Sequence, residues 1–422
     1  MKGNIWQILR MIMMKKTWVI IGKLHKMYRS DPSYSLRKGF RMLQFVLQDE
    51  KIVFHEGQFV INTFMPPFPS KAFEQYATGV IDPSQNAFFQ QTHAQRRAPI
   101  SMYLSLTHRC PYDCFHCSAK HRTSSEELTT DQWKQIIAAL QSMGVSVIGF
   151  TGGEPLLRDD LTDLISSIDD RSSSVLFTSG AGMTVQRAKQ MKAAGLFSVG
   201  ISLDSWDRDE HDDKRGHGGA FTQAVQAIQD CRKAGLYTMI QTMITPSEVN
   251  RAFLLRFFRF ARKLDAHEVK ILEPIPSGRL CFPKADQVFW TDSMRKTLIS
   301  IQNEANQTGQ YPKITSFPST ESPLRYGCGA GTQHSYIDSD GSLYPCDFVP
   351  LSFGNVAQHP VNELWRQMNQ AIGLPKTVCF ARQIHKELLG LAQPVPLDFS
   401  DSRKICEHNQ SYTYPGFYKN LQ

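Results

Sequence analysis

The middle of this 422-residue chain alternates between short apolar runs and longer segments with the periodicity of amphipathic helices. Strands that alternate with helices in this way form parallel βαβ units with right-handed crossovers. The pattern predicts an α/β domain, either a whole or partial barrel or a doubly wound sheet, with its chemistry at the carboxyl ends of the strands. The predicted strands are 102–106, 145–150, 174–178, 197–202, 236–243 and 268–272, and the helices between them lie near 129–143, 160–170, 184–194, 219–234 and 247–264.

The regions on either side lack this rhythm. Residues 4–28 are mostly apolar and contain no proline, which predicts a helix, and residues 52–61 alternate as in a small hairpin. After residue 275 the segments become short and rich in Pro and Gly, which indicates an irregular second domain. We therefore divide the chain into an N-terminal segment, a core and a C-terminal domain, with boundaries at 1–98, 99–280 and 281–422.

Basic residues are concentrated at the N-terminus. The formal net charge is +8, and residues 1–51 carry 11 of the 47 Lys and Arg but only three of the 39 Asp and Glu. The rest of the chain is electrically balanced, which argues against a nucleic-acid partner. Lys and Arg interrupt every apolar run of the predicted helix 4–28, so it does not span a membrane. It lies on an anionic membrane surface, or it packs on its own protein or on a dimer partner.

The nine cysteines are absent from the first 100 residues, and three of them fall within eight positions. Such clustering, without a secretory cleavage site, favours metal ligation in a reducing cytoplasm over disulfides. Cys110, Cys114 and Cys117 form a Cys-x3-Cys-x2-Cys loop directly after the first strand, so one loop offers three thiolates to a compact cluster. Structural zinc sites usually take four ligands in separated pairs. Two alternatives to such a cluster stay open. A fourth metal ligand comes from a distant part of the chain, or the three cysteines are ordinary residues of the core.

A second motif, Phe150-Thr-Gly-Gly-Glu-Pro155, follows the second predicted strand. It lies one βα unit further along the chain than the cysteine loop. Two glycines allow a backbone to approach a ligand closely, and Glu154 can accept a hydrogen bond from an ammonium group. Taken alone, the motif is equally well a simple turn from strand to helix.

Together, the cysteine loop and the Gly-Gly-Glu-Pro motif resemble the radical S-adenosylmethionine (SAM) enzymes over residues 100–280. The resemblance implies a partial (βα)6 barrel and a 4Fe–4S cluster whose fourth iron binds SAM. It implies that SAM is cleaved reductively to a 5′-deoxyadenosyl radical that abstracts hydrogen from a substrate, with a low-potential electron donor such as a flavodoxin or ferredoxin. Ser179 departs from the family, because relatives often carry Asn there. The residues that the resemblance places on SAM are His116, Thr151, Gly152, Gly153, Glu154, Thr178, Ser179, Ser202 and Asp204.

Cys328 and Cys346 bracket an Asp340-Gly341 turn, which predicts a hairpin that returns the second thiol towards the first. This spacing resembles the start of the SPASM and twitch extensions, which implies an auxiliary 4Fe–4S cluster. A full SPASM domain carries seven cysteines with a Cys-x2-Cys group, which this chain lacks. We predict one auxiliary cluster held by Cys328, Cys346, Cys379 and Cys406; if fewer bind, one iron is open to a substrate, and either of the last two is otherwise a core residue.

The function that follows is a radical SAM oxidoreductase or maturase with one auxiliary cluster. Relatives act on peptides, sugars and cofactor precursors, and an amphiphile becomes a candidate substrate if the N-terminus lies on a membrane. The alternative is a non-catalytic Fe–S electron-transfer or redox-sensing protein, which would have no need of the Gly152–Glu154 segment. The expected location is cytoplasmic, and peripheral on the inner membrane face if residues 1–51 bind anionic lipid.

Overall fold

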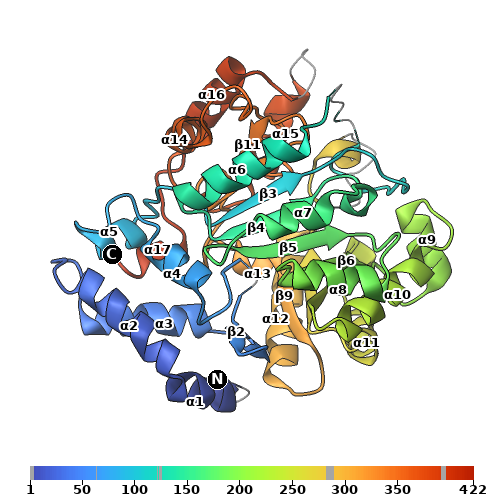
Figure 1. Ribbon diagram of the computed structural model, residues 1–422, viewed down its shortest axis with the longest axis horizontal. Coiled ribbons are helices and arrows are strands. Elements are labelled where there is room, and N and C mark those ends of the chain that lie inside the picture. The colour runs from blue at the N-terminus through green and yellow to red at the C-terminus, as the bar shows by residue number, and fades with distance from the viewer. Residues whose placement is uncertain (1–3, 63, 121, 123–125, 282–288, 391–395) are drawn as a thin grey trace.

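A computed structural model describes residues 4–62, 64–120, 122, 126–281, 289–390 and 396–422. Its centre is one nine-stranded sheet (Figure 1). The strands are β3 (Ser101–Ser105), β4 (Val147–Thr151), β5 (Ser173–Thr178), β6 (Ser198–Ser202), β7 (Tyr237–Met243), β8 (Glu268–Leu272), β9 (Lys313–Ser316), β10 (His334–Ile337) and β11 (Leu343–Tyr344). They lie in the order β11-β10-β3-β4-β5-β6-β7-β8-β9, and every neighbouring pair is parallel except β10 and β11.

Helices follow the strands and cover the outer face of the sheet (Figure 1). The connecting helices are α6 (Thr130–Met143), α7 (Leu161–Ser166), α8 (Val185–Ala193), α9 (Arg208–Arg215), α10 (Ala220–Lys233), α11 (Arg251–Lys263) and α12 (Asp292–Gln307). Outward-facing strand residues such as Leu104, Phe150 and Ile201 are fully buried against them. The six predicted strands are β3 to β8, and the predicted α/β fold with a partial (βα)6 barrel is confirmed.

The inner face of the sheet carries aromatic rings beside glycines. A Cβ on Gly149 would lie 2.5 Å from the Tyr103 ring, and one on Gly200 would lie 2.8 Å from the Phe177 ring. Glycine at these two positions therefore makes room for rings inside the barrel, where the backbone of a strand lies next to a large side chain.

The C-terminal region differs from the predicted separate, irregular domain. Strand β9 continues the barrel beyond β8, while β10 pairs with β3 at the opposite edge. The rhythm therefore extends past residue 275, although turns and short helices surround these strands. The remaining helices are α13 (Phe317–Thr320), α14 (Val361–Ile372), α15 (Phe380–Leu389), α16 (Phe399–His408) and α17 (Gly416–Lys419).

The N-terminal segment contains more helix than the sequence indicated. The single helix predicted at 4–28 is broken at Met14, where the backbone is extended, and further helices follow it. The elements are α1 (Ile5–Met13), α2 (Lys15–Tyr28), α3 (Leu36–Leu47), α4 (Lys71–Thr78), α5 (Ala87–Thr92) and a hairpin of β1 (Val53–His55) and β2 (Gln58–Val60). None of the described helices is both long and apolar enough to cross a membrane.

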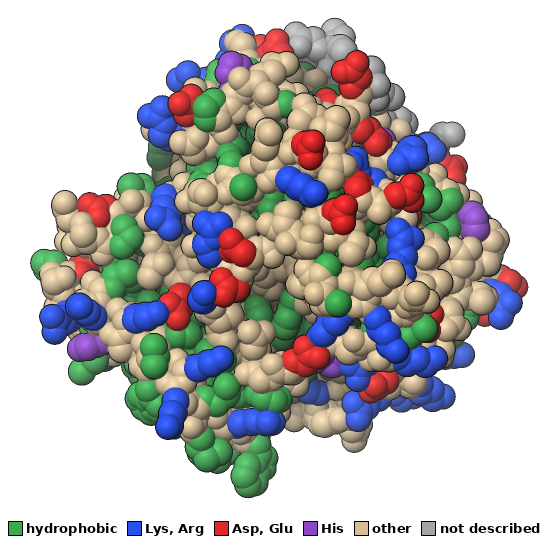
Figure 2. Space-filling model, in the orientation of Figure 1, with side chains coloured by type: hydrophobic (Ala, Val, Ile, Leu, Met, Phe, Trp, Pro, Cys, Tyr) green, Lys and Arg blue, Asp and Glu red, His purple; other side chains and the backbone are tan. Residues whose placement is uncertain are grey.

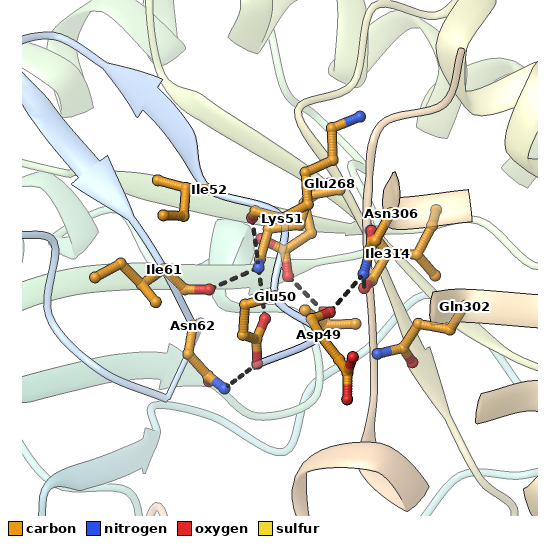
Figure 3. Close-up of polar contacts among 12 residues, drawn as sticks. Asp49, Glu50, Lys51, Ile52, Ile61, Asn62, Glu268, Gln302, Asn306 and Ile314 are labelled. Carbon is orange, nitrogen blue, oxygen red and sulfur yellow. Dashed lines mark hydrogen bonds and ion pairs between the residues drawn. The ribbon is translucent and has the colours of Figure 1, made fainter. Parts of the chain in front are cut away.

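A buried lysine ties this segment to the barrel. Lys313 of β9 donates hydrogen bonds to the Glu50 carboxylate at 2.7 Å, to the carbonyl of Lys51 at 2.8 Å and to that of Ile61 at 2.6 Å. Figure 3 shows the Glu50 carboxylate in this contact, with the Asn62 amide donating to its other oxygen at 2.9 Å. The basic segment is therefore anchored through its last residues, since a buried charge with several partners holds both sides in place.

Candidate active site

Two segments from elsewhere in the barrel hold the backbone of the first cysteine loop. At the end of α9, the carbonyl of Arg215 accepts from the amide of Asp113 at 3.0 Å, and a Cβ on Gly216 would lie 2.5 Å from the Asp113 carbonyl. On the other side, the Arg279 amide donates to the carbonyl of Cys117 at 3.0 Å, and its guanidinium donates to the carbonyl of Cys114 at 3.1 Å. The loop geometry is thus fixed without using any thiol.

The thiols themselves stay available for a ligand, and cations flank them. The Arg215 guanidinium lies 3.9 Å from the Cys114 sulfur and pairs with the buried Asp204 carboxylate at 2.7 Å. Although Cys110 is exposed as a residue, neighbouring atoms partly desolvate its thiol and raise its pKa to about 11, and the nearby thiols Cys114 and Cys117 add to the rise. Three thiols on one loop beside a fixed cation suit a shared iron–sulfur cluster, because thiols lose their protons when they bind a metal.

The Gly-Gly-Glu-Pro motif packs directly against the stem of this loop. The amide of Gly153 donates to the carbonyl of Thr107 at 2.6 Å, and a Cβ on Gly153 would collide with the carbonyl of Arg109. The two glycines therefore let two backbones meet, a close approach that the sequence interpretation assigned to a ligand. This contact places Thr151, Gly152 and Gly153 beside the cysteine loop.

Glu154 connects the second and third strands. Its fully buried carboxylate accepts from Thr178 Oγ1 at 2.6 Å, from the amide of Leu156 at 3.0 Å and from the amide of Ser179 at 2.8 Å, and Ser179 Oγ also donates to it. Four donors use the usual capacity of the two carboxylate oxygens. Thr178, Ser179 and Glu154 thus form one network at the carboxyl end of β5, and as SAM contacts they stay predictions.

The remaining predicted SAM contacts also lie at this edge of the sheet. Ser202 ends β6, and Asp204 follows it, with the Met243 amide donating to its carboxylate at 2.9 Å. The His116 Nδ1 atom is buried and has no hydrogen-bond partner among the described residues. Burial, with Arg215 nearby, lowers the pKa of His116 to about 4, so its imidazole is neutral and one ring nitrogen is left for a ligand.

Three of the later cysteines come together from separate segments. A hydrogen bond with the Cys379 sulfur, together with burial, raises the pKa of the Cys328 thiol well above its ordinary value. Burial, Asp347 and Cys328 raise the pKa of Cys346 in the same direction. The hairpin of β10 and β11 turns at Gly341, as predicted, and returns Cys346 towards Cys328. This donor set fits an iron–sulfur cluster.

Cys406 lies elsewhere, on α16. Its thiol is fully buried, and burial raises its pKa to about 12, with the Lys376 ammonium acting against the rise. Lys376 exchanges two backbone hydrogen bonds with Cys328, at 2.7 and 3.1 Å, so this lysine stands between Cys406 and the other three cysteines. The role of Cys406 as a fourth ligand stays a prediction.

One large cavity, of about 640 Å³, lies inside the barrel beside the later cysteines. Thr151 at the end of β4 lines it on one side, and Cys328, Cys346 and Cys379 line it on another. Its volume lies within the range of about 300 to 1,000 Å³ that is usual for small-molecule sites. The cavity is therefore large enough for a small-molecule substrate that lies between Thr151 and the later cysteines.

The sequence interpretation did not assign three of the residues that shape this site. Arg279 and Gly278 grip the first cysteine loop, and a signal for them existed, because Pro276-Ser-Gly-Arg279 follows the sixth strand where site residues gather. Lys270 lines the cavity from the middle of β8. Its signal is the lysine at the centre of the strand Glu-Val-Lys-Ile-Leu, on the same face of the sheet as Glu268.

Comparisons with known proteins agree with this geometry. Residues 104–256 match the radical SAM superfamily, and residues 328–383 match the SPASM iron–sulfur cluster-binding domain. The AdoMet-dependent heme synthase of Methanosarcina barkeri is 28% identical over 296 residues, which cover 64% of this chain and 83% of that protein. The protein of the same name from Nitratidesulfovibrio vulgaris is 29% identical over 287 residues, which cover 62% and 77%.

Solved structures share the fold at low sequence identity. SuiB of Streptococcus suis bound to the precursor peptide SuiA has a TM-score of 0.54 and 14% identity, and the match covers 66% of this chain and 67% of that one. The enzyme anSMEcpe with bound AdoMet has a TM-score of 0.52 and 17% identity, over 76% and 91%. By the two family matches, residues 104–256 form a radical SAM domain and residues 328–383 a SPASM domain, in an enzyme whose cofactors are a 4Fe–4S cluster with SAM and an auxiliary iron–sulfur cluster.

Proposed function

We propose that this enzyme modifies a haem precursor, a tetrapyrrole bound in the cavity inside its barrel. The observation that carries the proposal is that Thr151 and the three later cysteines line the same cavity. The relatives named AdoMet-dependent heme synthase support it, because the match covers most of their length.

Different residues of this chain would hold the two clusters and orient SAM. Cys110, Cys114 and Cys117 would hold the first cluster, and Cys328, Cys346 and Cys379 the auxiliary one. When bound, the first cluster with SAM supplies the 5′-deoxyadenosyl radical. The end of the sheet around Thr151 and Glu154 would orient SAM.

The cavity would orient the substrate and keep water out. The rings of Tyr103, Phe177 and Phe317 line it, and aromatic faces suit a flat, apolar macrocycle. Apolar side chains around a reactive radical also limit its side reactions with water. Cys110 is exposed, so a low-potential donor such as a flavodoxin or ferredoxin would reach the first cluster from this edge.

The test uses reconstituted enzyme under anaerobic conditions with SAM and dithionite. The candidate substrates are a series of iron porphyrins that differ in the number of carboxylate side chains, and a pool of unrelated peptides serves as the comparison. We expect a porphyrin to raise the rate of 5′-deoxyadenosine formation and to change in mass. A change in mass of the peptides and of none of the porphyrins would overturn the proposal.

We also propose that the N-terminal helices contact an anionic membrane surface. Large apolar side chains are exposed on α1, α2 and α3, among them Trp6 at 82%, Met13 at 76% and Trp18 at 57%. Figure 2 shows apolar and basic side chains interleaved over this part of the molecule. Monomeric proteins rarely expose large apolar patches without a partner, and basic helices with Trp bind at membrane interfaces.

Point variants test this contact better than a deletion, because removing residues 1–51 would also remove the Glu50 partner of the buried Lys313. We expect Trp6→Ser with Trp18→Ser to lower co-sedimentation with phosphatidylserine vesicles. Tyr412→Ser, at an exposed residue of the C-terminal region, is the matched control. Each nearby Lys or Arg contributes about 1 kcal/mol at such a surface, so binding should weaken as salt rises. Equal binding by the Trp variant and the native protein would refute the contact.

A further inference from the structure

Lys270 is a buried lysine without an oxygen partner. Its side chain is 3% exposed, lies in the middle of β8 and lines the cavity. No oxygen of the described residues accepts a hydrogen bond from its ammonium group, and no described carboxylate lies within 4.0 Å of it. Instead, the ammonium lies 4.8 Å from the centre of the Phe64 ring, 5.1 Å from that of Phe177 and 5.4 Å from that of Phe317.

The other buried lysines show what is missing. Lys313, on the neighbouring strand, donates to three oxygens, including the Glu50 carboxylate (Figure 3). Lys376 donates to two backbone carbonyls at 2.9 and 2.8 Å, and Lys214 pairs with the Glu248 carboxylate. Of the four lysines buried in the described parts of the chain, Lys270 alone lacks such an acceptor. An unpaired buried charge costs free energy. An anion from outside the chain that bound Lys270 would offset this cost.

The acidic groups around Lys270 do not supply this anion. Glu268 lies two positions away on the same strand. The hydroxyls of Tyr237 and Thr315, on the two neighbouring strands, donate to its carboxylate. Glu321 lines the same cavity but makes no ion pair with Lys270, and burial raises the pKa of its carboxyl well above the ordinary value, which disfavours its charged form. Asp347 acts on Lys270 only from a distance beyond that of an ion pair.

The other cations buried at the cavity are already paired. Arg295 and Arg382 both bind the Glu273 carboxylate, and Arg96 donates to the side chain of Gln91 and to the backbone. Among the described Lys and Arg residues that line the cavity, only Lys270 and Lys296 have no hydrogen-bond or ion-pair partner, and Lys296 is exposed whereas Lys270 is buried.

We propose that Lys270 is the anchor for a carboxylate side chain of the substrate, which reaches down the barrel while the body of the substrate lies against the Phe rings and the auxiliary cysteines. The inference rests on the proposed function, which places the substrate in this cavity, and adds the group that orients it. An ammonium group can donate three hydrogen bonds and forms a charge-assisted bond with a carboxylate, which is stronger in an apolar cavity than in water. The surrounding rings keep the cation in place before the substrate arrives.

The test measures affinity in the reconstituted holoenzyme by calorimetry. The probes are mesoporphyrin, which carries two carboxylates, and its diamide, in which both are neutral. We expect the native enzyme to bind the diacid more tightly than the diamide. Lys270→Met should weaken binding of the diacid about tenfold or more and leave the diamide unchanged, since hydrogen bonds to charged groups have this magnitude. Lys270→Arg should restore part of the loss, and Lys233→Met, at an exposed lysine, is the control.

Thermal unfolding without any probe gives a second readout. Because Lys270→Met removes an uncompensated buried charge from among apolar rings, we expect its Tm to equal or exceed that of the native protein. A large fall in Tm would show that the lysine has a partner within the chain, and would overturn the inference. Equal affinity of native and Lys270→Met proteins for the diacid would overturn the inference alone. Failure of the native enzyme to bind either porphyrin would instead overturn the proposed function, and the anchor with it.

Discussion

The two cysteine sites of this enzyme are built in opposite ways. Cys110, Cys114 and Cys117 lie on one loop, partly accessible, and neighbouring segments hold that loop mainly through its backbone. Cys328, Cys346 and Cys379 come from three segments that meet only when the chain is folded, and they face the cavity. The first site is thus a local structure, whereas the second depends on the pairing of β10 with β3.

This difference teaches where each site is vulnerable. The first should tolerate changes around the later cysteines, because the end of α9 and residues 278–279 hold its backbone, although His108 of the loop stem also pairs with Asp338 at the end of β10. The second site should be sensitive to any change that loosens the C-terminal region, because its three cysteines lie on separate segments of that region. The predictions below test this contrast, starting with the largest effect.

Replacing Cys110, Cys114 and Cys117 together with Ala should abolish formation of 5′-deoxyadenosine, because no other described group can replace three thiolates on that loop. Product is quantified by chromatography after incubation with SAM and dithionite. The auxiliary site should keep about four irons, the content of one 4Fe–4S cluster. If this variant formed 5′-deoxyadenosine at the native rate, the first cysteine loop would not hold the cluster that cleaves SAM.

Replacing Cys328, Cys346 and Cys379 with Ala should have the complementary effect. About four irons per chain should be lost, while 5′-deoxyadenosine still forms in the absence of substrate, because the first loop has its own supports. Iron analysis and the same product assay measure both. Loss of all iron would show that the two sites are not independent.

Arg215→Met should destabilise the protein by roughly 3 kcal/mol, because it leaves the fully buried Asp204 carboxylate without its cation. Urea unfolding of the protein without clusters measures the free energy. Arg279→Met is the matched control, since Arg279 grips the same loop but its partner Asp113 is exposed, and we expect a much smaller loss. Equal losses would mean that the buried pair is not what fixes the loop.

Cys406→Ala decides whether the auxiliary site has three thiolates or four. Since Lys376 stands between Cys406 and the other cysteines, we expect native iron content and a loss of about 1 kcal/mol from the small cavity left in the core. A fall in iron that matches the loss in the triple variant of Cys328, Cys346 and Cys379 would establish Cys406 as a ligand.

The affinity for a carboxylate probe should depend on pH through Lys270. Burial among rings lowers its pKa to about 8, against the smaller opposing effects of Glu268, Glu321 and Asp347. Only the protonated lysine attracts a carboxylate, so affinity is full below this pKa and falls as pH rises through it. Between pH 7.5 and 8.5, at constant salt, we expect a fall of roughly threefold, and none in Lys270→Met. A rise in affinity over this range would contradict the assignment.

The barrel could be predicted from the sequence because each βα unit carries its own periodicity, as in the run 197–202 that became β6. Helix α9 could not, because its eight residues are all charged or polar and have no apolar face to reveal a period. Cys110 to Cys117 were recognisable as one loop. The approach of Cys379 to Cys328 has no local signal, since it depends on contacts between distant segments. The sequence identified Gly152 and Gly153 as a place of close approach to the backbone. The group that approaches them is the backbone of the cysteine loop, not only a ligand.

The most direct test of the account is one anaerobic experiment on the native protein. Iron is counted after reconstitution, and 5′-deoxyadenosine is then measured in the presence of SAM and dithionite. The account predicts about eight irons per chain, as two 4Fe–4S clusters require, together with formation of 5′-deoxyadenosine. A protein that holds this iron and yields no 5′-deoxyadenosine would contradict it.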